Sequence, residues 1–160
     1  MLSINTGSQP KLNAIAGASF GHAVKPIKSF ITQWESWLTA QQSKSDPTTN
    51  VAVVGGGAAG IEVILAISHR LRALNIEVKL SLICAADSLL SGHNRRVQTL
   101  ITKHLAAANI AVFYNSAVTA ATATGITINN NKELLSDFTV WAVNAQAKPW
   151  LANTELSCNK

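Results

Sequence analysis

Two short apolar runs in the middle of the chain flank a segment in which apolar residues recur at helical spacing. Residues 51–54 read Val-Ala-Val-Val, a continuous apolar run typical of a strand buried on both faces of a sheet. Residues 58–74 place apolar side chains on one stripe and basic ones outside it, which predicts an amphipathic helix. Residues 78–84 form the second apolar run. This order of strand, helix and strand is the unit from which parallel sheets are built.

The same alternation continues further along the chain. Residues 95–108 predict a second helix, and the apolar residues 110–114 predict a third strand. A final apolar run at residues 138–143 predicts a strand that returns to the main sheet. We therefore expect an α/β fold with a parallel sheet.

A different period separates the third strand from the last one. Residues 118–120 and 126–128 are short strand-like segments on either side of Gly125. Asn-Asn-Asn-Lys at residues 129–132 is a strong turn signal. These features predict a β-meander inserted into the α/β unit.

The N-terminal third is less regular. Residues 1–25 hold short apolar runs broken by glycine and proline, and residues 43–50 form a polar linker. Pro26 suits the first turn of a helix, and apolar residues then follow at helical spacing: Ile27, Phe30, Ile31, Trp34, Trp37 and Leu38. The apolar stretch 51–68 is nearly long enough to cross a bilayer, but three glycines and Glu62 interrupt it. No transmembrane segment is expected.

Composition narrows the function classes. The 160 residues suffice for one domain, and the low charged fraction of 13% fits either a surface that faces another domain or an alanine-rich core. The net charge of +5 suits an anionic partner such as a dinucleotide phosphate, whereas scattered basic residues do not predict a nucleic-acid partner. Cys84 and Cys158 form no CxxC, and the four histidines lack metal-ligand spacing, so no metal site is expected. No secretory signal is visible, which favours the cytoplasm.

The main functional signal is the glycine loop that joins the first predicted strand to the first predicted helix. Gly55, Gly57 and Gly60 satisfy GxGxxG, a pattern that gains specificity inside a strand–turn–helix of this kind. Gly55 allows the tight turn, Gly57 lets backbone approach a pyrophosphate, and Gly60 lets the helix pack closely on the strand. The helix N-terminus, with Ala58 and Ala59, offers N–H groups to phosphates. The loop predicts a Rossmann-like three-layer domain that binds NAD(H) or NADP(H).

The second part of this fingerprint is missing. An acid normally ends the second strand and holds the adenosine ribose, but Cys84 stands there and the first acid is Asp87. No arginine follows immediately to favour a 2′-phosphate. The choice between NAD and NADP therefore stays open at this stage, and so does the loss of the ligand.

Glu62 has two interpretations. A carboxylate in the first turn of a helix gains from the macrodipole, which would be a purely structural role. Its apolar neighbours instead suggest a polar group that faces a ligand or another domain.

These segments together resemble the pyridine nucleotide-disulfide oxidoreductases, flavoproteins with two dinucleotide-binding domains. The similarity is greatest to their type II NADH dehydrogenase branch, which includes a module fused to selenide, water dikinase in some bacteria. Residues 53–62 resemble the VGGGxxGVE signature of the NAD(P)H domain, and residues 82–90 resemble LVEAxDRLL with Cys84 in place of the acid. Other matches are the TGS turn and both crossover segments, in residues 2–10, 24–27, 141–144 and Pro149.

The resemblance implies a domain organisation and a set of cofactors. Residues 1–25 would be a stub of an FAD domain with its crossover, 26–50 a linker helix and loop, 51–143 the NAD(P)H-binding domain, and 144–160 the return crossover. The chain would be a piece of a larger parent whose FAD domain is its partner and whose FAD accepts hydride from NAD(P)H. The isolated piece would be inactive, and no catalytic residue is assigned. The resemblance also allows a parent that lies peripherally on the inner face of the membrane.

The resemblance further places two residues at the nicotinamide end of the site. Glu62 would lie near the nicotinamide, and Asn144 stands where the family's ATG turn has glycine. Asparagine is the residue other than glycine that best tolerates positive φ.

One alternative function stays open: a regulatory or interaction module that keeps the fold but has lost dinucleotide binding. A homodimer through the helix that carries Trp34 and Trp37 is likewise open, beside internal packing of that helix.

Overall fold

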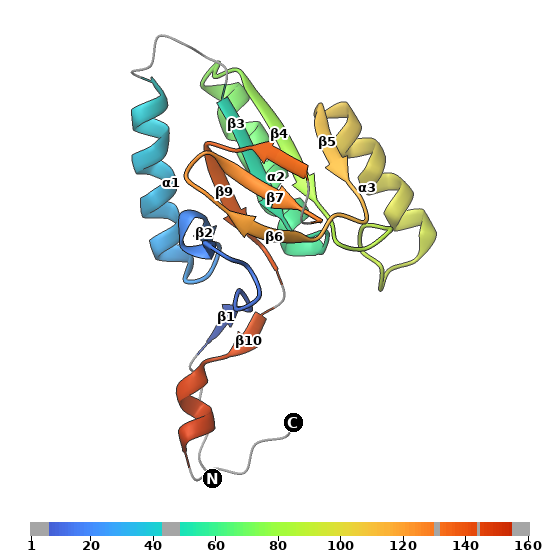
Figure 1. The fold of residues 1–160 in the computed structure, drawn as a ribbon. Helices are drawn as coiled ribbons and strands as arrows, with labels where there is room; N and C mark the ends of the chain where they lie inside the picture. The colour runs from blue at the N-terminus through green and yellow to red at the C-terminus, as the bar shows by residue number, and fades with distance from the viewer. Residues whose placement is uncertain (1–6, 43–48, 130–131, 144, 155–160) are drawn as a thin grey trace.

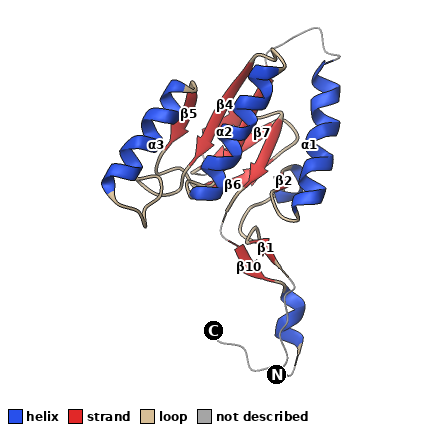
Figure 2. Ribbon diagram, turned by 180° about the vertical axis from the view of Figure 1, so that it is seen from behind, coloured by secondary structure: helices blue, strands red, loops and turns tan. Residues whose placement is uncertain are grey.

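The computed structural model describes residues 7–42, 49–129, 132–143 and 145–154. Three layers form the body of the molecule (Figures 1 and 2). The middle layer is a five-stranded parallel sheet, in the order β2 (His22–Ala23), β9 (Phe138–Trp141), β3 (Thr49–Val54), β4 (Val78–Ile83) and β5 (Ile110–Phe113). One face carries the helices α1 (Ile27–Gln42), α2 (Ala58–Ala73) and α3 (Arg95–Ala107). The α/β class with its parallel sheet is confirmed.

The third layer is the predicted β-meander. Strands β6 (Val118–Ala121), β7 (Gly125–Ile128) and β8 (Lys132–Leu135) form a three-stranded antiparallel sheet on the face opposite the helices. The predicted turn at 129–132 is shorter than expected, because Lys132 already pairs with Ile128 as the first residue of β8. Asn130 and Asn131 lie outside the described residues.

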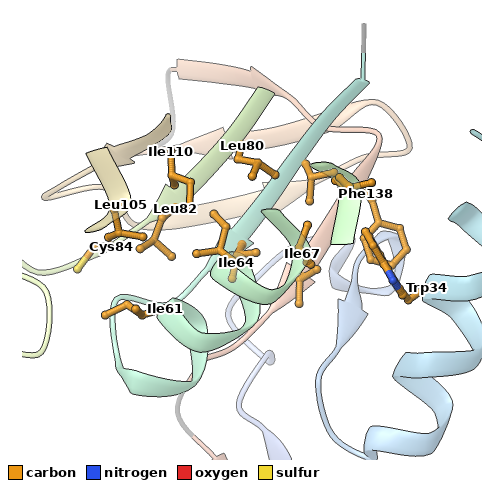
Figure 3. Close-up of a cluster of buried hydrophobic side chains, with 14 of the residues drawn as sticks. Trp34, Ile61, Ile64, Ile67, Leu80, Leu82, Cys84, Leu105, Ile110 and Phe138 are labelled. Carbon is orange, nitrogen blue, oxygen red and sulfur yellow. The ribbon is translucent and has the colours of Figure 1, made fainter. Parts of the chain in front are cut away.

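Strand β3 shows why both faces of the sheet are covered. Val51 and Val53 point to the helix side and join a core cluster with Ile64 of α2, whereas Ala52 and Val54 belong to a second cluster under the meander. All four are buried, as the continuous apolar run predicted. Figure 3 shows the helix-side cluster, in which the labelled residues of α2 face those of β4 and β5: Ile61, Ile64, Ile67, Leu80, Leu82 and Ile110.

The N-terminal segment belongs to the same body. Phe30, Trp34 and Leu38 of α1 are buried in the helix-side core, and the Trp34 ring meets Phe138 edge-on at 5.4 Å between centroids. Strand β2 extends the sheet beyond β9, with His22 opposite Val140. The segment assigned to a crossover and a linker thus packs against the sheet, and β3 begins at Thr49, two residues inside the predicted linker.

A short antiparallel ribbon projects from one end of the body. Strand β1 (Ser8–Pro10) pairs with β10 (Ala145–Ala147), and a 3₁₀ helix, η2 (Pro149–Asn153), follows β10. Figure 1 shows the ribbon below the layers, reached from β9, whose strand ends at Trp141 and not at the predicted Val143. Within the described part of the chain, no helix is long and apolar enough to cross a membrane.

Candidate dinucleotide-binding site

The glycine loop lies at the carboxyl end of β3, the edge of a parallel sheet where ligands bind. The N–H of Gly55 donates to the carbonyl of Ile83 (2.8 Å), which ties the start of the loop to β4. Gly57 is the N-cap of α2, and no side chain caps the helix there. The first N–H groups of a helix have no partner within the helix, so this end can donate to an anion.

Two glycines in the loop have structural roles. Gly55 has φ +136°, and a Cβ on it would collide with the carbonyl oxygen of Ala142. A Cβ on Gly60 would collide with the carbonyl oxygen of Gly55, because α2 lies directly on the turn. The tight turn and the close helix packing are therefore confirmed.

Gly57 differs from these two. Among the described residues, no atom lies within 4 Å of a Cβ built on Gly57, so the residue faces open space in that part of the structure. The space in front of the helix N-terminus suits a phosphate group. The pyrophosphate contact of Gly57 stays a prediction.

Two cavities meet at the glycine loop. The larger has a volume of about 510 Å³ and lies between the ends of β3, β4 and β5 and the meander. The smaller has about 300 Å³ and reaches toward the ribbon, where Pro10 and Ala145 line it. Both cavities are lined by Gly57, Ala142 and Val143, and Ala58 and Ala59 line the smaller one. The arrangement offers an elongated ligand two binding chambers with the helix N-terminus between them.

Cys84 lines the larger cavity directly after β4, but its side chain is turned inward. It is 3% exposed, and its Sγ donates to the carbonyl of Ser88 at 3.5 Å. A Cβ on Gly56 would collide with this sulfur, so the thiol occupies the space beneath the glycine loop. Cys84 therefore packs against the loop. A ligand contact through its thiol stays a prediction.

Glu62 requires a correction. It is the fifth residue of α2, and the first turn of that helix holds no acid, so the stabilising role in the first turn is wrong. Its side chain is exposed, and it lines neither of the two cavities. The approach of Glu62 to a nicotinamide stays a prediction without support from the cavity geometry.

Asn144 lies outside the described residues. The residues just before it are placed: Ala142 donates its N–H to the carbonyl of Val54 (2.9 Å), and Val143 lines both cavities. The segment that resembles the family's ATG turn therefore starts next to the two cavities, at Ala142 and Val143.

The sequence prediction missed the polar lining of the larger cavity. Lys11, Ser88, Ser91 and Ser116 contribute to its wall. Ser88, Ser91 and Ser116 follow β4 and β5, so the rule that loops after parallel strands form the ligand site could have found them. Lys11 follows β1, outside the parallel sheet, and no local pattern marks it.

Comparisons with known proteins agree with this geometry. The family model described as pyridine nucleotide-disulphide oxidoreductase matches residues 2–160. The chain belongs to this family. No curated protein matches the sequence closely enough to serve as a relative.

Solved structures show the same fold. NDH2 from Plasmodium falciparum in complex with NADH superposes with a TM-score of 0.78 at 21% identity, over 89% of this chain and 34% of that one. A NAD-dependent persulfide reductase from A. fulgidus gives 0.70 at 21% identity, over 92% and 26%. An engineered water-forming NADPH oxidase bound to NADPH gives 0.70 at 17% identity, over 93% and 31%. This oxidoreductase module thus spans at most about a third of each of these structures.

Proposed function

We propose that this chain is the NAD(P)H-binding domain of an FAD-dependent oxidoreductase and presents the nicotinamide for hydride transfer to the flavin. The observation that carries the proposal is the uncapped N-terminus of α2 between two cavities, with Gly57 open in front of it. Family membership and the NADH- and NADPH-bound solved structures of the same fold support it.

The site suits a dinucleotide whose adenosine lies in the larger cavity and whose nicotinamide lies in the smaller one. The larger cavity lies at the ends of β4 and β5, the usual place of an adenosine, and its backbone is already ordered by pairing. The helix N-terminus at Gly57 would take the pyrophosphate. The smaller cavity would then hold the nicotinamide between Val24, Trp141 and Ala145.

This direction brings the nicotinamide end toward the β1–β10 ribbon. By the resemblance stated above, the ribbon leads to the FAD domain of the parent, so the reactive ring would face its partner. NAD(P)H supplies the hydride and FAD accepts it. The residues of this chain bind and orient the dinucleotide, and none of them is assigned a catalytic role.

Calorimetric titration of the chain with NADH and with NADPH tests the proposal. Saturable binding of either one supports it, because binding needs only the glycine loop and the two cavities. An absence of heat with both ligands at millimolar concentration contradicts it and favours a module that keeps the fold without the ligand.

A further inference from the structure

The adenosine end of the proposed site differs from an NAD-selective one in the residue at the end of β4. A carboxylate at that point binds the ribose hydroxyls of NAD and repels the 2′-phosphate of NADP. Cys84 can do neither, because it has no carboxylate and its side chain is buried and directed at Gly56 and the carbonyl of Ser88.

The loop after Cys84 is held in place by its own anchors. Leu89 and Leu90 are 2% and 8% exposed, and the N–H of Leu90 donates to the carbonyl of Gly56 (3.0 Å). On the other side, the N–H of Asn115 donates to the carbonyl of Ala86 (2.9 Å). The wall of the cavity is therefore preformed, and ordering it costs little when a ligand binds.

This wall presents hydroxyl groups and positive charge. Ser88 and Ser91 flank the anchoring leucines and line the cavity, and Lys11 is the one charged side chain among its described lining residues. Asp87 lies beside the cavity but does not line it, and its carboxylate accepts a hydrogen bond from the Ser88 hydroxyl (3.0 Å). Because the Ser88 and Ser116 hydroxyls already donate to Asp87 and to the carbonyl of Tyr114, the groups of this wall that could donate to a 2′-phosphate are the Ser91 hydroxyl and the Lys11 ammonium, and no carboxylate is among the described lining residues.

We infer that this site accepts the 2′-phosphate and binds NADP(H) at least as tightly as NAD(H), with Cys84 as the residue that sets this preference. The inference rests on the proposed function and names the form of dinucleotide that the same site takes. Cys84 sets this preference without contacting the ligand, because the position lacks the carboxylate that would repel the 2′-phosphate.

The first test compares four ligands on the unmodified chain. NADH and NADPH are titrated side by side, and AMP is compared with adenosine 2′,5′-bisphosphate, which probes the adenosine end alone. We expect the 2′-phosphorylated ligand of each pair to bind as tightly as its partner or more tightly. NADH binding tighter than NADPH by more than the error of the titration would overturn the inference and leave the proposed function standing. Failure of both dinucleotides to bind would overturn both.

The second test introduces a carboxylate at position 84. Cys84→Glu should weaken NADPH relative to NADH by roughly tenfold or more, the effect of one charged group on a close phosphate. Cys84→Gln is the matched control, because it has the same shape without the charge, and should keep the wild-type ratio within about threefold. Melting temperatures of both variants report whether the larger side chain disturbs Gly56. An unchanged ratio in a folded Cys84→Glu variant would show that this position does not set the preference.

Discussion

Replacement of Gly57 by aspartate should separate ligand binding from folding. Gly57 is the N-cap of α2 with φ −83° and ψ 179°, extended backbone that any residue adopts, and a Cβ there meets no atom of the described residues within 4 Å. Aspartate is among the best N-cap residues and exceeds glycine there by a few tenths of a kcal/mol. For a domain of this size that corresponds to roughly 1 °C in Tm, so Gly57→Asp should melt at or slightly above the wild-type temperature.

The affinity for the dinucleotide should fall, although the melting temperature should not. The new carboxylate would accept the N–H groups that the pyrophosphate needs, and it would lie next to the phosphate charges. Two like charges about 4 Å apart at an effective dielectric constant of about 20 repel by about 4 kcal/mol. That energy corresponds to a loss of roughly a thousandfold in affinity for either dinucleotide.

The assay combines calorimetric titration with thermal melting. Ala66→Asp serves as the matched control, because it adds the same charge to an exposed position of α2 that lines neither cavity. The control should bind like the wild type. Retained affinity in Gly57→Asp would refute the placement of the pyrophosphate at this helix end, and a lower melting temperature would refute the conclusion that the fold has room for a side chain at this position.

Four further outcomes follow from the structure. Gly60→Ala should lower stability by about 1–3 kcal/mol in denaturant unfolding, because its Cβ would collide with the backbone of Gly55; a wild-type midpoint would show that α2 can shift. Phe138→Ala should cost about 3–5 kcal/mol by the same measurement, since this buried ring contacts Trp34 and Trp37. Glu62→Gln should leave dinucleotide affinity within about twofold in calorimetry, because Glu62 lines neither cavity, and a larger loss would restore its role at the nicotinamide. The purified chain should show no flavin absorption band, and a yellow protein would contradict its assignment to the pyridine nucleotide.

The parts of the fold that the sequence predicted are those with local periodicity. Strand β3, helix α2 and strand β4 each bury a repeating face, so the pattern of apolar residues carries the information. Strand β2 has only two residues and exists because His22 and Ala23 pair with β9, far away in the chain. Such long-range pairing leaves no local signal.

The candidate site divides in the same way. The glycine loop could be predicted because each glycine satisfies a local steric demand of the turn. The inward direction of the Cys84 side chain could not be predicted, because it depends on the space beneath Gly56, a residue of the loop after the neighbouring strand β3. Glu62 is the fifth residue of a helix that begins at Ala58, as predicted, so it lies just beyond the first turn in which a carboxylate gains from the helix dipole.

The β1–β10 ribbon has a consequence for how this domain could be inserted into a longer chain. Ser8 lies opposite Ala147 and Pro10 opposite Ala145, so the incoming and outgoing chain segments run side by side, roughly 5 Å apart. If the domain were inserted into a loop of a longer chain, the two ends of that loop would already be close together. The insertion would then add little loop-closure entropy. The ribbon would therefore let a longer chain carry this domain as an insertion in which the two cavities at the glycine loop are already formed.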